Sequence, residues 1–303
     1  MQCGVLERKF KHVTDMRIPG YLNSVPQGAV GQLDLIYRDS ISWYETFLAE
    51  VEAAIGNRYL PIYRMADGEF IFNVGRYADP FTLSVSPLDW MRYIINVVRY
   101  GWQRRQQVNL ATCWGESYSD QELCALKDHY IECLSEIASE GYIALHFTKS
   151  KGKFSEQYFR PMCRWFESVG VNIESENYLP FYFVYALLCG PDFRALISNR
   201  SVLIITAANE DKADKIKRSL LRMGASSVFF KKISSNKAML DKVDVSDIPE
   251  RIDLALVGAG VGSVNILAQL KTLQTVCLDA GVFIEILADE KKRGRIFTVP
   301  DHE

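Results

Sequence analysis

The chain has 303 residues, of which 48% are hydrophobic and 24% are charged. This balance is typical of a globular protein and excludes a mostly disordered, collagen-like or coiled-coil chain. Lys and Arg number 35 against 37 Asp and Glu, so the net charge of −2 gives no overall preference for nucleic acid or an anionic membrane. The 7 cysteines never form a Cys-x-x-Cys pair, which favours reduced thiols over a disulfide framework or a zinc site.

Two features of the sequence bear on localisation. The most apolar run, Phe181–Cys189, is far shorter than the roughly 20 apolar residues of a membrane-spanning helix, and it is predicted to be a buried helix. The first residues, MQCGVLERKFKH, lack the apolar stretch of a signal peptide. The sequence therefore predicts a cytoplasmic protein with no membrane span and no nucleic-acid partner.

The start of the chain differs from the rest. Residues 1–30 carry little periodicity and are interrupted by prolines and glycines, which predicts an N-terminal extension ahead of one large domain over residues 31–303. Apolar residues recur at helical spacing from Leu33 to Ile55, and Gly56-Asn57 supplies the stop. The domain is therefore predicted to begin with a helix.

Strands and helices alternate after this first helix. The predicted strands cover residues 59–64, 108–112, 142–147, 201–206, 227–230, 254–257 and 275–278. The predicted helices between them begin near residues 86, 119, 209 and 263. Several strands are continuous apolar runs, as expected of strands covered on both faces, although Pro61 in the first indicates an edge or a strand start. This order predicts an α/β, Rossmann-like fold with a mostly parallel sheet flanked by helices.

Ligands of such sheets bind at the carboxyl ends of the strands, so the residues that follow each strand are the candidates for a site. Four strand ends are notable: Arg64 to Glu69, His146 with the basic loop 149–153, the glycine loop 258–263, and Asp279-Ala280-Gly281. A lone His in an apolar strand is usually a core residue, whereas at a strand end it could act as a base.

Asp67 and Glu69 flank Gly68 directly after the first predicted strand. In an extended or turn backbone, residues two apart point the same way, so two carboxylates could meet one hard cation. Gly68 would allow a tight turn, and Arg64 offers a guanidinium fork suited to phosphate. Together they would neutralise a diphosphate leaving group. The alternative is an ordinary strand-to-helix turn in which Glu69 favours the first helical turn.

The segment Arg64-Met65-Ala66-Asp67-Gly68-Glu69 resembles the R-x-G-D-G-E signature of the GT-D-type glycosyltransferases, in which a DxE motif stands in place of the usual DxD. The resemblance extends weakly to the C-terminal part. There the strand at 254–257, the Gly258-Ala259-Gly260 turn, a helix, a further strand and Asp279-Ala280-Gly281 follow that family's order of strand, G-P-[TA] turn, helix, strand and D-x-G. Three positions depart from the pattern: Ala66 for Gly, Ala259 for Pro, and Val282 for a frequent His.

This resemblance implies a metal-dependent glycosyltransferase, hexosyltransferase-like, that uses a nucleotide-sugar donor, most readily a UDP-sugar. The acceptor would be a hydroxyl of a glycan or glycoconjugate, and Asp67 and Glu69 would bind Mn²⁺ or Mg²⁺. The residues that would bind the donor are Arg64, Gly68, Gly258, Gly260 and Asp279. The catalytic base is not assigned, with His146 and Asp279 as weak candidates.

The glycine loop supports other interpretations. With Asp279 about 20 residues further on, it matches the dinucleotide fingerprint G-x-G-x-x-G except that Ser263 takes the place of the third glycine. An NAD(P)-dependent oxidoreductase built on Gly258 to Ser263 is therefore an alternative. A non-catalytic nucleotide- or sugar-binding protein of the same fold is another, and the loop could also pack a helix against a strand without any ligand.

Overall fold

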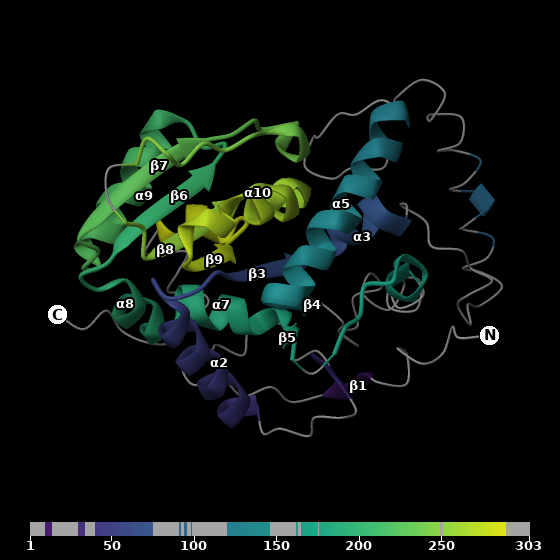
Figure 1. The fold of residues 1–303 in the computed structure, drawn as a ribbon, viewed down its shortest axis with the longest axis horizontal. Helices are drawn as coiled ribbons and strands as arrows, with labels where there is room; N and C mark the ends of the chain where they lie inside the picture. Colours follow the sequence, from purple (N-terminus) through teal and green to yellow (C-terminus); the bar gives the residue numbers. More distant parts are fainter. Residues whose placement is uncertain are drawn as a thin grey trace.

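The computed structural model describes residues 10–13, 30–33, 40–74, 120–145, 165–174, 176–248 and 251–288, together with positions 91, 94, 95, 98 and 162. One sheet contains β3 (Leu60–Met65), β4 (Tyr142–Leu145), β5 (Tyr178–Pro180), β6 (Ser201–Thr206), β7 (Ser227–Lys232), β8 (Leu254–Gly258) and β9 (Val276–Asp279). All its neighbouring strands are parallel, in the order β5-β4-β3-β9-β8-β6-β7 (Figure 1). The predicted α/β fold with a parallel sheet is confirmed.

The helices whose bounds lie in the described residues are α2 (Ser40–Ala54), α3 (Asp67–Val74), α5 (Asp120–Glu140), α7 (Phe181–Cys189), α8 (Pro191–Ile197), α9 (Glu210–Arg222), α10 (Ser263–Gln269) and α11 (Phe283–Leu287). The described residues also form the short 3-10 helices η2 (Ala238–Leu240), η3 (Gly260–Gly262) and η4 (Leu270–Leu273). A separate two-stranded antiparallel sheet pairs β1 (Phe10–Val13) with β2 (Val30–Leu33).

The sheet lies between two layers of helices. Helices α5 and α10 pack on one another over β3, whereas α7, α9 and α11 lie together on the other face (Figure 1). Helix α2 packs outside α7, where the ring of Phe183 lies 5.3 Å from that of Trp43 and 6.1 Å from that of Phe47. Every residue of β3 and β6 is buried, which explains why these strands are continuous apolar runs in the sequence.

The topology places the first and last strands of the sheet, β3 and β9, side by side. The chain starts the sheet at β3, adds β4 and β5 on one side, crosses to β6 and β7, and returns through β8 to β9. The first and last strands are therefore neighbours, with Leu60 in register with Val276 and Ile62 with Leu278. Because the two strands are parallel, their carboxyl ends meet at the same edge of the sheet, which is the edge where open α/β sheets bind ligands.

One local prediction is wrong, and the structure decides between two alternatives left open for Pro61. The first helix begins at Ser40, because Leu33 lies in β2 and pairs with Phe10. This pairing also joins the predicted extension to residues beyond position 30. Strand β3 is not an edge strand, since β4 and β9 flank it, so Pro61 marks a strand start instead. The sequence patterns missed β5 and α8.

Other predictions fare better or lie outside the described residues. The apolar run Phe181–Cys189 forms the buried helix α7, as predicted. Of the helix predicted from Ser86, the four described positions are helical. The strand predicted at 108–112 lies outside the described residues. No helix in the described ranges is long and apolar enough to cross a bilayer.

We expect Gly141→Ala to lower the free energy of unfolding by about 1–3 kcal/mol, because overpacking against rigid atoms forces the backbone to shift. A Cβ at Gly141, between α5 and β4, would lie 2.0 Å from the carbonyl oxygen of Pro61. Urea unfolding checks this result. The control Ser139→Ala, at an exposed position of α5, should change stability by less than about 0.5 kcal/mol. Equal effects of the two substitutions would contradict the packing argument.

Candidate functional site

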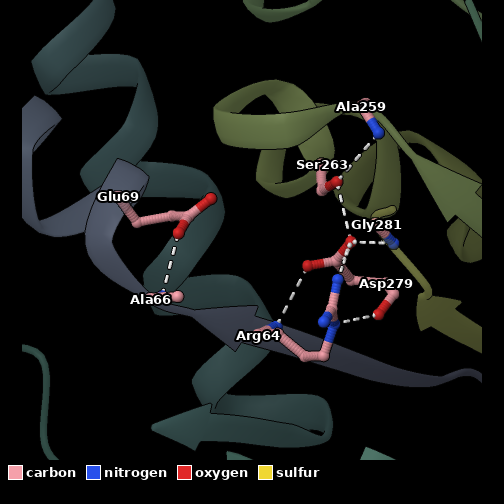
Figure 2. A network of polar contacts seen from close by, with 7 residues as sticks. All are labelled: Arg64, Ala66, Glu69, Ala259, Ser263, Asp279 and Gly281. Carbon is pink, nitrogen blue, oxygen red and sulfur yellow. Dashed lines mark hydrogen bonds and ion pairs between the residues drawn. The ribbon is translucent and has the colours of Figure 1, made fainter. Parts of the chain in front are cut away.

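The candidate site lies where the carboxyl ends of β3 and β9 meet. Strand β3 supplies Arg64 and leads through Ala66 into α3, while β9 ends on Asp279. Figure 2 shows Glu69 on the α3 side, and Arg64, Asp279, Ser263 and Gly281 gathered on the other. Of the sequence candidates, the fold thus brings Arg64, Glu69 and Asp279 to one edge of the sheet.

Glu69 caps the helix in which it lies. Ala66 precedes α3 and accepts the first helical hydrogen bond from the Phe70 N–H at 3.0 Å. The Oε2 atom of Glu69 accepts a hydrogen bond from the Ala66 N–H at 2.9 Å (Figure 2). A Glu at the third helical position that bonds back to the capping residue is half of a capping box. The alternative that Glu69 belongs to a first helical turn is therefore confirmed for its backbone.

This helix changes the geometric argument for the DxE pair. The expectation that Asp67 and Glu69 point the same way assumed an extended backbone, and that assumption is wrong because α3 begins at Asp67. Residues two apart in a helix are separated by about 200° around its axis. The capping contact nevertheless returns the Glu69 carboxylate to the amide of Ala66, the residue directly before Asp67. The side chain of Asp67 lies outside the described part of the structure.

Glu69 is an acid with an unusually high pKa. Its side chain is buried, and burial raises its pKa from 4.5 to about 7, with a smaller upward contribution from Asp279. The Ala66 N–H opposes the rise, and Arg64 opposes it more weakly. A buried carboxylate without full compensation is the kind of group that clusters at functional sites. A bound cation would favour its ionised form.

Arg64 is buried and held on several sides. Its Nε donates to the backbone carbonyl of Asp279 at 2.5 Å, and its Nη2 lies 3.7 Å from Oδ1 of the same residue. The guanidinium also lies over the rings of Phe181, Tyr185 and Phe283, at 5.2, 5.2 and 5.9 Å. Burial alone would lower the pKa of Arg64, but Asp279 and other neighbours raise it above its usual value. Arg64 therefore stays charged.

Asp279 connects three segments of chain. Its Oδ2 accepts from the Arg64 N–H of β3 at 3.3 Å, and its Oδ1 accepts from the Ser263 hydroxyl of α10 at 3.0 Å (Figure 2). The same Oδ1 accepts from the Gly281 N–H at 3.1 Å. Burial raises the pKa of the Asp279 carboxyl, whereas Arg64, Ser263 and the backbone donors lower it. Both oxygens are thus engaged within the protein.

The glycine of the Asp-Ala-Gly turn is required by Arg64. Gly281 has a φ of +50°, and a Cβ there would lie 1.9 Å from Nη2 of Arg64. Only a residue without a side chain lets the backbone wrap so closely around the guanidinium. This contact gives a physical reason for the D-x-G pattern at the end of β9.

The glycine loop after β8 is closely packed. A Cβ at Gly262 would lie 2.4 Å from Cβ of Ala238 in η2, and one at Gly258 would lie 2.8 Å from Cδ1 of Ile284 in α11. Gly260 has a φ of +56°. Gly262 therefore serves the contact between η3 and η2, which supports the interpretation of this glycine as a packing residue.

Sequence patterns missed part of the site. Ser263, noted only as a departure from the dinucleotide fingerprint, links Asp279 to the N–H of Ala259, which donates to its hydroxyl at 3.3 Å. No periodic signal pointed to the aromatic rings around Arg64. Two candidates, His146 and the basic loop 149–153, lie outside the described residues.

The donor chemistry fits a hard divalent cation in part. The carboxylate of Glu69 accepts a hydrogen bond from Ala66. The carboxylate oxygens of Asp279, in contrast, already accept hydrogen bonds from Arg64, Ser263 and Gly281. Carboxylate oxygens are the ligands that Mg²⁺ and Mn²⁺ prefer. Among the side chains that the structure describes, no three His, Cys, Asp or Glu residues gather as a metal cage. A cation here would therefore rely on Glu69, on Asp67 and on oxygens of a ligand.

We expect Asp279→Asn to lower the free energy of unfolding by about 3–5 kcal/mol, because it leaves the charge of Arg64 buried and unpaired. Ser263→Ala removes one hydrogen bond to the same carboxylate and should lower it by about 1 kcal/mol. Urea unfolding of both variants checks the ranking. Equal, small losses of stability in the two variants would show that the ion pair contributes little to the free energy of unfolding.

A second prediction concerns pH. Because the pKa of Glu69 is raised from 4.5 to about 7 in the folded protein, its protonated form stabilises the fold below pH 4.5, and this contribution is lost as the pH rises through 7. The difference in the free energy of unfolding between the wild type and Glu69→Gln should fall by about 3 kcal/mol as the pH rises from below 4.5 to above 7, without added metal. Urea unfolding at several pH values measures it. A difference that is constant with pH would contradict the raised pKa.

The chain resembles known structures at low sequence identity. Two solved structures of the domain of unknown function 1792 resemble it at 13% sequence identity and a TM-score of 0.47. One, described as having a distinct glycosyltransferase fold, is matched over 83% of this chain and 87% of its own. The other, substituted with selenomethionine, is matched over 85% and 88%. A comparison with curated proteins gave no match.

The sequence profile of the GT-D fold-like domain matches residues 126–287, more than half of the chain. The matched region begins after Glu69 and includes β8, β9 and Asp279, so it supports the assignment independently of the DxE segment. The chain belongs to the GT-D-like family.

Proposed function

We propose that the protein is a glycosyltransferase that moves a sugar from a nucleotide-diphosphate donor to a hydroxyl of a glycan or glycoconjugate, with a divalent cation held by Asp67 and Glu69. The observation that carries the proposal is the position of the buried Glu69 carboxylate at the junction of β3 and α3, in a chain of the GT-D-like family. A UDP-sugar is the first donor to test.

Each part of this edge of the sheet has a task in the proposal. A bound Mn²⁺ or Mg²⁺ would neutralise charge on the diphosphate as it leaves. Asp67 and Glu69 would hold the cation at the start of α3, and the positive end of this eight-residue helix would favour the anionic diphosphate. Gly68 is buried between the two acids and leaves no side chain in the way of the donor.

Arg64 contributes in this proposal through the positions of other groups. Its Nε and Nη2 are directed at Asp279, and aromatic rings cover its guanidinium, so the free phosphate fork expected from the sequence is already engaged. Its buried positive charge still lowers the electrostatic potential energy of an anion nearby. The donor would therefore lie against the turn that Arg64 and Asp279 fix, near Gly258 and Gly260.

The reaction requires a base. The acceptor oxygen forms a bond to the anomeric carbon, the bond from that carbon to the diphosphate oxygen breaks, and the proton of the acceptor hydroxyl passes to the base. Asp279 is poorly placed for this task, because Ser263, Gly281 and Arg64 already donate to both of its oxygens. His146, directly after β4 in the sequence, remains the candidate.

The oxidoreductase alternative requires Asp279 to bind a ribose hydroxyl and the glycine loop to seat a pyrophosphate. The engaged oxygens of Asp279 and the close packing of Gly262 on Ala238 both weigh against it. The non-catalytic alternative is compatible with the same contacts, and turnover distinguishes it from the enzyme.

Asp67→Asn should lower the rate of metal-stimulated UDP release from UDP-sugars by about 10²-fold or more, since it removes charge from the proposed cation site. The free energy of unfolding should change by less than about 1 kcal/mol. The matched control is Asp211→Asn, an exposed carboxylate in the first turn of α9, which should keep wild-type activity.

Thermal shift with a panel of UDP-sugars and Mn²⁺, and with NAD(P), completes this experiment. Stabilisation by UDP-sugar and Mn²⁺ with turnover supports the proposal. Binding without turnover of any donor selects the non-catalytic alternative. Stabilisation by NAD(P) alone, or full metal-stimulated activity in Asp67→Asn, would contradict the proposed function.

A further inference from the structure

One buried polar atom beside the candidate site lacks a hydrogen-bond partner. Asn73 lies in α3, one helical turn beyond Glu69, and is 8% exposed. Its Oδ1 atom accepts no hydrogen bond from any residue that the structure describes. Native proteins rarely leave a buried acceptor unpaired, because its lost contact with water is then not compensated. This oxygen therefore needs a partner that the described part of the chain does not supply.

The contacts of the amide nitrogen fix the orientation of the Asn73 side chain. Its Nδ2 donates to the backbone carbonyl of Glu69 at 2.9 Å. Burial raises the pKa of the Tyr130 hydroxyl, and a hydrogen bond from Asn73 opposes that rise, so Tyr130 is a second acceptor for the same amide. Exchange of the amide nitrogen and oxygen would place two carbonyl oxygens against one another. The atom left without a partner is therefore the oxygen.

Asn73 lies on the same face of α3 as Glu69. Residues four apart in a helix share one face, and their positions differ by about 6 Å along the helix axis. The Glu69 carboxylate is directed toward Ala66, at the start of the helix. A cation and a diphosphate at that end would leave Asn73 one turn further along α3. Because the sugar of a donor is attached to its diphosphate, a sugar ring would occupy this part of the site.

The chemistry of the unpaired oxygen selects the group that binds it. An amide carbonyl oxygen accepts hydrogen bonds and donates none, so it does not pair with the ionised phosphate oxygens of a donor. A second cation is disfavoured, because no three His, Cys, Asp or Glu side chains gather among the described residues. A hydroxyl group donates one hydrogen bond and adds no charge beside Glu69. The sugar of the donor carries several such groups.

We propose that Asn73 is a specificity-determining residue of the donor site, and that its Oδ1 accepts a hydrogen bond from a hydroxyl of the donor's sugar ring. The inference rests on the proposed function and deepens it, because it concerns the sugar and not the nucleotide or the cation. A sugar that lacks this hydroxyl would leave the buried oxygen unpaired, and a site built to bind a hydroxyl rejects such an analogue strongly. Asn73 thus selects among nucleotide sugars that share the same diphosphate.

Calorimetric titration of the full chain in the presence of Mn²⁺ tests the inference. It compares UDP with whichever of UDP-glucose, UDP-galactose and UDP-N-acetylglucosamine binds the wild type most tightly. Asn73→Ala should weaken binding of that UDP-sugar about tenfold and binding of UDP less than about twofold, because UDP has no sugar to lose contact with. Asn73→Ser should show the same sugar-specific loss. Its hydroxyl can still donate to the carbonyl four residues earlier, so this variant keeps the contact with Glu69 but lacks the amide oxygen.

Deoxy analogues of the same UDP-sugar identify the hydroxyl. One analogue should bind the wild type about tenfold more weakly than the parent sugar, whereas Asn73→Ala should bind the two equally. A wild type that binds every deoxy analogue as tightly as the parent would overturn the inference without any variant.

The matched control is Asn57→Ala. The Asn57 amide also donates to the carbonyl four residues earlier, that of Ala53 at 3.0 Å, but Asn57 is exposed in the turn after α2. This variant should bind UDP and the UDP-sugar like the wild type. Thermal unfolding of all variants verifies that they fold.

Two results would overturn the inference and leave the proposed function intact. One is wild-type affinity for the UDP-sugar in the Asn73 variants. The other is an equal loss of affinity for UDP and UDP-sugar, which would indicate that Oδ1 binds an ordered water and supports the shape of α3. A wild type that binds neither UDP nor a UDP-sugar would instead contradict the proposed function, and the inference with it.

Discussion

The contact between Arg64 and Asp279 is the interaction on which the rest of this edge of the sheet depends. It joins the first and last strands of the sheet, which lie more than 200 residues apart in sequence. Two hydrogen bonds each connect the side chain of one residue to the backbone of the other, and the two side chains form a buried pair of opposite charges. A buried charge is expensive unless it is paired and hydrogen-bonded, so neither residue can lose the other without a large penalty. Gly281 and Ser263 take their positions from the same carboxylate.

The two buried acids at this edge therefore have different physical roles. Asp279 is surrounded by donors and holds the scaffold together. Glu69 accepts a backbone hydrogen bond from Ala66, yet burial still raises its pKa to about 7, so its negative charge is incompletely compensated. A bound cation would therefore stabilise the ionised carboxylate of Glu69, at the N-terminus of α3, more than that of Asp279. The account of function depends on this asymmetry more than on the spacing of the DxE motif.

Much of the fold could be predicted from the sequence, because apolar runs and their alternation with helices report burial directly. Strands β3, β4, β6, β8 and β9 lie where the patterns predicted them. The site was harder to predict. Which strand ends become neighbours depends on strand order, so the pairing of Arg64 with Asp279 left no local signal. Likewise, the start of α3 at Asp67 depends on the capping contact of Glu69 with Ala66, which decides between an extended turn and a helix.

The most direct test of the central claim is a crystal structure of the protein with UDP and Mn²⁺. The account predicts anomalous density for one manganese ion at about 2.0–2.6 Å from carboxylate oxygens of both Asp67 and Glu69, with diphosphate oxygens completing its coordination. Arg64 and Asp279 should remain paired beside it. Manganese bound elsewhere, or a diphosphate that binds without contact between the ion and these two carboxylates, would contradict the account.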